Sequence, residues 1–147
     1  MANFFSTFEC KLDAKGRLVL PAKFKAALPE TDGNELVLRK GDDGCLEVHP
    51  AFEFQKTLNK VSAMSNYDPK QKAFKREFLG NLTEVELDSA GRLLIPKFLQ
   101  EHAGIDKVAV VIGVGKSMEI WNPDRHAAAQ QQLSPEDFES LATQFLD

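Results

Sequence analysis

The sequence predicts an α+β protein made of two copies of one β unit, with helical arms after each copy. Three observations lead to this fold class. A phrase of ten residues occurs twice, as LDAKGRLVLP at residues 12–21 and as LDSAGRLLIP at residues 87–96. Later in each copy, residues 36–50 and residues 108–123 hold two apolar stretches around a Gly-containing turn, which is the pattern of paired strands. Apolar residues at helical spacing follow both copies.

Each repeated phrase predicts a tight turn between two strands. Gly16 and Gly91 stand third in a three-residue loop, where the backbone takes the left-handed conformation that glycine adopts at least cost. An aspartate then faces an arginine across the strands, Asp13 opposite Arg17 and Asp88 opposite Arg92. Each pair either forms an ion pair that only fixes the register, or the aspartate accepts the turn amides and leaves the guanidinium pointing outward.

A strand and a short helix are expected after each arginine. The aliphatic runs at residues 18–20 and 93–95 are typical of strands buried on both faces. The next residue is proline in both copies, which ends the strand and starts a helix, predicted over residues 22–28 and 97–103.

Longer helices join and follow the copies. Apolar residues at 3.6-residue spacing after residue 50 predict one helix, and Asp68 before Pro69 predicts the start of a second that ends before Gly80. We therefore divide the chain into residues 1–80 and 81–147, two halves that share one core.

Two further helix starts are predicted near the C-terminus. Asn122 before Pro123 suits a helix start, and Ser134 opens a capping-box pattern. Residues 133–147 contain four acidic and no basic residues, so we expect a solvated, polar-faced helix there and no nucleic-acid contact.

Composition and charge limit the classes of function. The 147 residues are 43% hydrophobic and 27% charged, as in soluble globular proteins. The sequence has neither a spanning apolar run nor a signal peptide, so a cytoplasmic protein with no membrane partner is expected. The net charge of -4 argues against indiscriminate binding to polyanions. Residues 11–25 nevertheless carry five Lys or Arg residues against one Asp, a local basic excess.

Sequence motifs of catalysis and metal binding are missing from the chain. Cys10 and Cys45 form no CxxC pair, the three histidines are dispersed, and no phosphate loop or nucleophile motif occurs. We expect no catalytic residue, no metal ligand, no cofactor and no small-molecule substrate. Asp13 and Asp88 as an acid-base pair would make an enzyme, but their role in the turns already explains them.

The arginines beside the turns suggest nucleic-acid binding. A planar guanidinium suits phosphate oxygens and guanine edges, and a ribbon of strands fits the major groove. Lys15 adds a cation to the first turn, whereas Ala90 replaces it in the second, and Phe98 and Gln100 replace Lys23 and Lys25. We therefore expect the first turn to contribute more to affinity.

Two Asp-x-x-Gly-Arg turns, each followed by three aliphatic residues and proline, resemble the MraZ family of bacterial transcriptional regulators over essentially the whole chain. Each half is similar to the AbrB-like swapped-hairpin fold, which implies a pseudo-symmetric, barrel-like core. The resemblance implies binding to short repeats in double-stranded DNA, upstream of the division and cell-wall gene cluster that includes the protein's own operon. It also implies a ring-shaped homo-oligomer associated with the nucleoid.

The resemblance assigns roles residue by residue. Arg17 and Arg92 are the expected DNA contacts, and Asp13, Gly16, Asp88 and Gly91 build the turns. Lys15 lies within the first motif, and we expect it to be an additional DNA contact. The competing hypothesis is an oligomeric structural or protein-interaction scaffold without DNA binding, in which apolar helix faces pack against neighbouring subunits or another protein.

Overall fold

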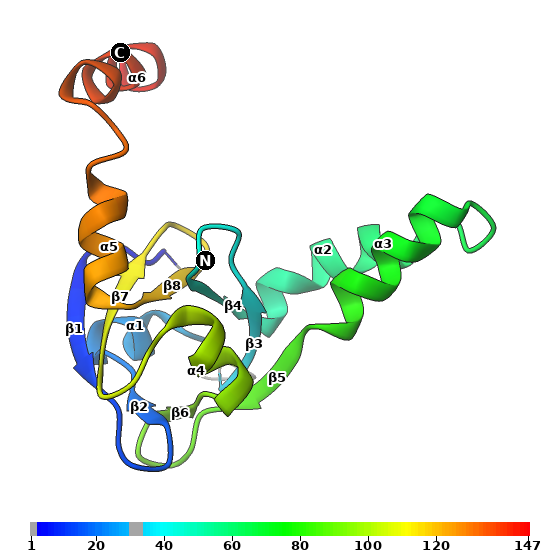
Figure 1. Ribbon diagram of the computed structural model, residues 1–147, viewed down its shortest axis with the longest axis horizontal. Helices are drawn as coiled ribbons and strands as arrows, with labels where there is room; N and C mark the ends of the chain where they lie inside the picture. Colours follow the sequence, from blue (N-terminus) through cyan, green and yellow to red (C-terminus); the bar gives the residue numbers. More distant parts are fainter. Residues whose placement is uncertain (1–2, 30–33) are drawn as a thin grey trace.

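The computed structural model describes residues 3–29 and 34–147, and its elements follow the same order in both copies (Figure 1). The first copy contains β1 (Thr7–Lys11), β2 (Arg17–Val19), α1 (Ala22–Ala27), β3 (Glu35–Lys40) and β4 (Leu46–Pro50). The second contains β5 (Thr83–Glu86), β6 (Arg92–Leu94), α4 (Lys97–Ala103), β7 (Val108–Gly113) and β8 (Met118–Trp121). Helices α2 (Ala51–Ser62) and α3 (Pro69–Gly80) follow the first copy, and α5 (Pro123–Gln130) and α6 (Pro135–Leu146) follow the second. The α+β class and the internal repeat are confirmed.

Strand pairing interleaves the two copies. The six-stranded antiparallel sheet has the order β1-β7-β8-β4-β3-β5, so β1 lies beside a second-copy strand and β5 beside a first-copy strand. Strands β4 and β8 pair where the two halves of the sheet meet. Strands β2 and β6, one from each copy, form a separate two-stranded antiparallel sheet. Both copies therefore depend on each other for their strand partners.

The predicted barrel-like core of swapped hairpins is not confirmed. Among the described residues, β1 and β5 are the edges of the sheet and do not pair with each other, so the sheet stays open. The hairpin expected around each turn is also incomplete. In the first copy, β1 forms its ladder with β7, and strand pairing across the turn is limited to an isolated bridge between Leu12 and Leu18. The physical reason is that β2 finds its ladder partner, β6, in the other copy.

Strands β2 and β6 are covered on one face only, which corrects the prediction of two buried faces. Leu18 and Leu93 lie opposite each other and are fully buried. Val19 is 57% exposed and Leu94 is 51% exposed. Because no other layer of the described residues lies outside this two-stranded sheet, alternate side chains point to solvent. We call its outer surface, formed by Arg17, Val19, Arg92 and Leu94, the ribbon face.

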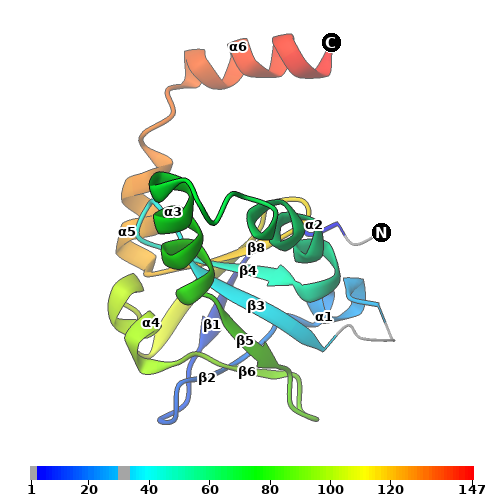
Figure 2. The ribbon, with the colours of Figure 1, turned by 90° about the vertical axis from the view of Figure 1, so that its right-hand side faces the viewer.

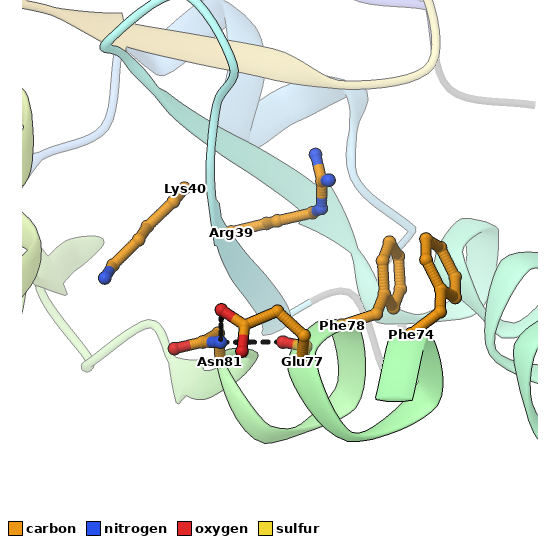
Figure 3. A pocket seen from close by; sticks show the side chains of 6 residues that line it. All are labelled: Arg39, Lys40, Phe74, Glu77, Phe78 and Asn81. Atoms are coloured by element: carbon orange, nitrogen blue, oxygen red, sulfur yellow. Dashed lines mark hydrogen bonds between the residues drawn. The ribbon is translucent and has the colours of Figure 1, made fainter. Parts of the chain in front are cut away.

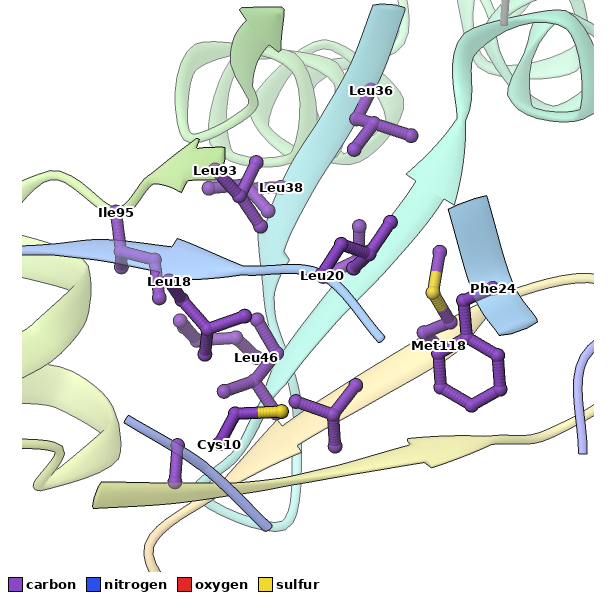
Figure 4. Close-up of a cluster of buried hydrophobic side chains, with 14 of the residues drawn as sticks. Cys10, Leu18, Leu20, Phe24, Leu36, Leu38, Leu46, Leu93, Ile95 and Met118 are labelled. Atoms are coloured by element: carbon purple, nitrogen blue, oxygen red, sulfur yellow. The ribbon is translucent and has the colours of Figure 1, made fainter. Parts of the chain in front are cut away.

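The core beneath β2 and β6 takes side chains from both copies (Figure 4). Leu18 and Leu46 come from the first copy and Leu93, Ile95 and Met118 from the second, and all are almost completely buried. Complete burial of one such side chain stabilises the fold by about 1.5–3 kcal/mol. Because Leu18 of β2 and Leu93 of β6 belong to this core, the core holds the ribbon face in place.

Local capping produces the helix starts that the sequence predicts. The Asp68 side chain accepts the amides of Lys70 and Gln71, and the Asn122 side chain accepts those of Asp124 and Arg125. The Ser134 hydroxyl accepts the Asp137 amide at 3.0 Å. Helices α1 and α4 begin directly after Pro21 and Pro96, as expected. These interactions satisfy amides that have no partner inside the helix.

The longer helices project from the sheet (Figures 1 and 2). Helices α2 and α3 form one arm, in which the rings of Phe54 and Phe78 stack with centroids 6.3 Å apart. Helix α6 stands away from the body beyond α5, and none of its residues is buried. It is solvent-exposed as predicted, but it is not simply polar, because it exposes Phe138, Leu141, Phe145 and Leu146. Among the described helices, none has the length and hydrophobicity needed to cross a membrane.

Candidate nucleic-acid interface

The first turn, residues 13–17, is organised by Asp13. The Arg17 carbonyl accepts the Asp13 amide at 2.9 Å, and the Asp13 carbonyl accepts the Gly16 amide at 3.0 Å. Oδ1 of Asp13 accepts the amides of Lys15 and Arg17, both at 2.9 Å, and Oδ2 accepts Nε of Arg17 at 2.7 Å. Gly16 has φ +83°, so the turn uses the left-handed conformation that the sequence predicts.

The second turn, residues 88–92, repeats this geometry. Oδ1 of Asp88 accepts the amides of Ala90 and Arg92 at 3.0 and 2.9 Å, and Oδ2 accepts Nε of Arg92 at 2.7 Å. Gly91 has φ +75°. Two sites 75 residues apart in the sequence therefore present the same aspartate, glycine and arginine in the same arrangement.

Both alternatives that the sequence left open for the Asp-Arg pair occur together. Each aspartate accepts the turn amides and also binds the arginine, but only through Nε, the nitrogen nearest the aliphatic stem. Within residues 3–29 and 34–147, no interaction engages the terminal nitrogens of Arg17 or Arg92. The side chains of Arg17 and Arg92 are 30% and 34% exposed. The carboxylate orients the guanidinium and leaves its terminal donors available to a ligand.

The electrostatics of the two aspartates suit a structural role. The backbone amide of Arg17 holds the pKa of Asp13 below its usual range, together with the Arg17 side chain and the Lys15 amide. The pKa of Asp88 is lowered in the same way by the Arg92 amide, the Arg92 side chain and the Ala90 amide. A general acid at neutral pH needs a raised pKa, so these carboxylates are poor candidates for the acid-base pair of an enzyme.

The two arginines belong to one surface, because β2 and β6 pair with each other. Arg17 lies opposite Leu94, and Arg92 lies opposite Val19. Diagonal neighbours in an antiparallel pair are about 7–8 Å apart, so both guanidinium groups rise from one patch. The turns before β2 and β6 project from the same end of the molecule (Figure 2). The arginines of the two turns therefore share one continuous surface, the ribbon face.

Backbone hydrogen bonds tie each turn to the other copy. The Gly91 carbonyl accepts the Leu20 amide at 3.1 Å, and the Gly16 carbonyl accepts the Ile95 amide at 3.0 Å. These reciprocal bonds fix the positions of the two turns relative to each other. Neither copy can move its arginine far without breaking bonds to the other.

The lysines of the local basic excess at residues 11–25 do not all lie at the first turn. Lys15 is exposed within that turn. Lys23 lies elsewhere, where its ammonium contacts the Ser6 hydroxyl at 3.2 Å and lies 3.6 Å from the centre of the Phe5 ring. Lys25 lies beside the second turn, against Gly91. Residues two apart on a helix point about 200° away from each other, which separates Lys23 from Lys25.

Sequence reasoning missed the two exposed aliphatic residues of the ribbon face, Val19 and Leu94. Each is the middle residue of a three-residue aliphatic run, so nothing in the local pattern separates it from its buried neighbours. Each apolar side chain lies opposite an arginine, so the ribbon face is a mixed surface that can contact both polar and methyl groups.

A cavity lies between β3 and α3 (Figure 3). It has a volume of about 220 Å³ and is lined by Arg39, Lys40, Phe74, Glu77, Phe78 and Asn81. The Arg39 guanidinium lies 4.9 Å from the centre of the Phe78 ring, and Asn81 donates to the Glu77 carboxylate at 3.1 Å. The lining therefore combines two cations with stacked aromatic rings. In the described residues, no group of three or more metal-binding side chains gathers there or elsewhere.

Comparison with known proteins supplies a family. A family model described as "MraZ protein, putative antitoxin-like" matches the chain twice, over residues 4–77 and 78–147. A protein of Cytophaga hutchinsonii named transcriptional regulator MraZ is 42% identical over 146 residues, which cover 99% of this chain and 96% of that protein. Proteins of the same name from Thermomicrobium roseum and Heliobacterium modesticaldum are 38% and 35% identical. The aligned regions cover 90% and 98% of this chain, and 91% and 97% of those proteins.

Proposed function

Because the chain belongs to the MraZ family, we propose that it is a transcriptional regulator that binds double-stranded DNA through the ribbon face. We further propose that its targets are short repeats upstream of the division and cell-wall gene cluster, its own operon included. In this function Arg17, Arg92 and Lys15 contact DNA, while Asp13, Gly16, Asp88 and Gly91 shape the turns. The protein would then act in the cytoplasm at the nucleoid, without a cofactor.

One observation carries the proposal: the two arginines lie on the same partly exposed ribbon face, and each binds its aspartate through Nε alone. A two-stranded ribbon fits the major groove of B-DNA, where an arginine can donate both terminal hydrogen bonds to O6 and N7 of guanine. The Nε bond to aspartate restricts each guanidinium before DNA arrives, which reduces the entropy lost on binding.

The apolar residues of the ribbon face support recognition of bases as well as backbone. Val19 and Leu94 stand diagonal to each other on the same face as the arginines. An aliphatic side chain in the major groove can pack against the C5-methyl group of thymine. The face is therefore suited to short sites in which guanine lies beside thymine.

Because the chain carries a net charge of -4, one ribbon face alone should bind DNA weakly. Self-association would raise the affinity. Several ribbon faces held at a spacing that matches repeated sites gain avidity that one subunit lacks. We propose a homo-oligomer, ring-shaped by resemblance, in which each subunit presents one ribbon face.

Helix α6 supports this assembly. It exposes Phe138, Leu141 and Phe145, and residues 133–147 carry four acidic and no basic residues. The cavity between β3 and α3 offers aromatic rings and the Lys40 ammonium to such a helix, beside the Glu77 carboxylate and an Arg39 that is paired with Glu47 at 3.1 Å. Helix α6 lies far from that cavity in its own chain (Figure 1), so the fitting occupant is α6 of a second copy. Replacing Phe138 and Phe145 by Ser should reduce the mass measured by light scattering. An unchanged mass would exclude α6 as the contact.

Selection of bound duplexes from a random-sequence pool tests the proposed function. Wild-type protein should enrich repeats spaced by about one helical turn of DNA, roughly 10 base pairs. Arg17→Ala should enrich no motif, whereas Arg76→Ala should behave as wild type, because Arg76 is an exposed cation on the α3 arm.

A further variant separates base reading from charge. Arg17→Lys keeps the positive charge but loses the planar fork, so it should retain non-specific binding and lose sequence preference. Equal enrichment by Arg17→Ala and wild type would contradict the assignment of the ribbon face. Failure of the wild type to bind any duplex would favour the scaffold hypothesis.

A further inference from the structure

The two turn glycines are covered by side chains from the opposite copy. Gly16 and Gly91 are buried, although both turns project from one end of the molecule (Figure 2). A β-carbon on Gly16 would overlap Nε2 of Gln100 in α4. A β-carbon on Gly91 would lie 3.0 Å from Nζ and 3.2 Å from Cδ of Lys25 in α1. Each turn is therefore packed under a helix that follows the other turn.

Each turn lies next to a side chain from the other copy. Lys25 and Gln100 occupy equivalent positions in the two copies, each four residues after the proline that precedes its helix. Because the helices cross over, the lysine of the first copy reaches the second turn, and the glutamine of the second copy reaches the first. The second turn has Ala90 where the first has Lys15, so Lys25 supplies the cation that its own loop lacks.

The result is an even charge distribution along the ribbon. The first turn holds Arg17 and Lys15, both from the first copy. The second holds Arg92 from the second copy and Lys25 from the first. The expectation that the first turn contributes more to DNA affinity holds only if each helix lies beside the turn of its own copy.

The side chain of Lys25 is available to a ligand. Lys25 is exposed, and no hydrogen bond or ion pair joins its ammonium to another residue in the described part of the chain. The nearest acidic group of the turn, Asp88, is committed to two backbone amides and to Nε of Arg92. The ammonium therefore lies beside the second turn without an ion-pair partner among the described residues.

We propose that Lys25 is a DNA contact of the second turn, binding a backbone phosphate beside the site of Arg92. The inference rests on the proposed function, because it needs DNA on the ribbon face. It makes the second turn equal to the first in the number of cationic contacts, and it makes that contact a joint product of both copies.

Salt dependence of DNA binding tests this role. Each phosphate contact contributes about 0.9 to the slope of log K against log salt concentration. On a random-sequence duplex of defined length, Lys25→Met should reduce the magnitude of the slope by about 0.9 for each engaged subunit. Methionine keeps the aliphatic cover over Gly91, so a purely structural role of Lys25 would leave the slope unchanged. Lys25→Arg should retain it.

Two further variants complete the design. Lys23→Met removes a charge from the same helix away from both turns, and its slope should match the wild type. Gln100→Lys places a second lysine beside the first turn and should increase the slope by about 0.9 for each engaged subunit.

The outcomes distinguish the inference from the proposed function. Wild-type binding that is lost in Arg17→Ala but unchanged in slope in Lys25→Met would overturn the role of Lys25 alone. Equal losses in Lys23→Met and Lys25→Met would also overturn it, because a general charge effect would then suffice. A wild-type protein that binds no duplex would overturn both.

Discussion

Replacing Gly16 by alanine tests whether the first turn depends on its contact with α4 as well as on its backbone conformation. Gly16 has φ +83°, and holding alanine in the left-handed region costs about 1–2 kcal/mol. The added methyl group also overlaps Nε2 of Gln100, which donates to the Ile95 carbonyl at 2.7 Å. Displacing Gln100 forfeits a hydrogen bond that typically contributes about 1 kcal/mol. Gly16→Ala should therefore lower the free energy of unfolding by about 2–3 kcal/mol.

The second turn provides a matched control with the same conformation and a softer neighbour. Gly91 has φ +75°, and the atoms nearest a new β-carbon belong to the side chain of Lys25, 3.0–3.4 Å away. An exposed lysine can swing aside at little cost. Gly91→Ala should thus lose only the conformational part, about 1–2 kcal/mol.

Urea unfolding at one fixed protein concentration measures both variants. The single tryptophan, Trp121, is 5% exposed, so its fluorescence should report loss of the core. Gln100→Ala relieves the overlap, and the double variant Gly16→Ala/Gln100→Ala should therefore lose less stability than the sum of the single variants. Equal losses for the two glycine variants, or strict additivity in the double variant, would refute the proposed packing.

Three other predictions concern pH, cooperativity and thiol chemistry. Because the pKa values of Asp13 and Asp88 are lowered in the folded state, their stabilising contribution is fully present above the unfolded value of about 3.9. This contribution is lost as pH falls through the folded pKa. The free energy of unfolding, measured by urea titration at a series of acidic pH values, should therefore fall less steeply with decreasing pH in Asp13→Asn/Asp88→Asn than in the wild type. Since the copies exchange strand partners, we propose that the halves fold as one unit. Fragments 1–80 and 81–147 should then lack stable structure by circular dichroism, and an independently folded fragment would disprove shared folding. Burial raises the pKa of Cys45 to about 12, so it should resist iodoacetamide at pH 8 in native protein and react in urea, as followed by mass spectrometry.

Local interactions explain the part of the site that could be predicted. The positive φ of Gly16 and Gly91 follows from the loop length, and the side-chain bonds of Asp13 and Asp88 span at most four residues. The caps at Asp68, Asn122 and Ser134 reach no further than three residues. Such features depend on residue type and short spacing, which are written directly in the chain.

Strand partners were not predictable in the same way. The strand after each turn was expected to pair mainly across that turn, yet β2 forms its ladder with β6. A three-residue aliphatic strand has no pattern that specifies its partner, and a buried run resembles a half-exposed one. The solvent exposure of Val19 and Leu94 therefore became visible only with the sheet assembled.

The amino-acid order determined the two turns, the arginine in each, the helix starts and the family, because each depends on neighbouring residues or on the repeat itself. The folded chain decided that the two arginines share one face, that the sheet stays open, and that Lys25 serves the second turn. The shared face and the position of Lys25 arise from contacts between residues 66 to 77 positions apart. Such contacts form because buried leucines from both copies pack together, and that packing has no counterpart in any short stretch of sequence.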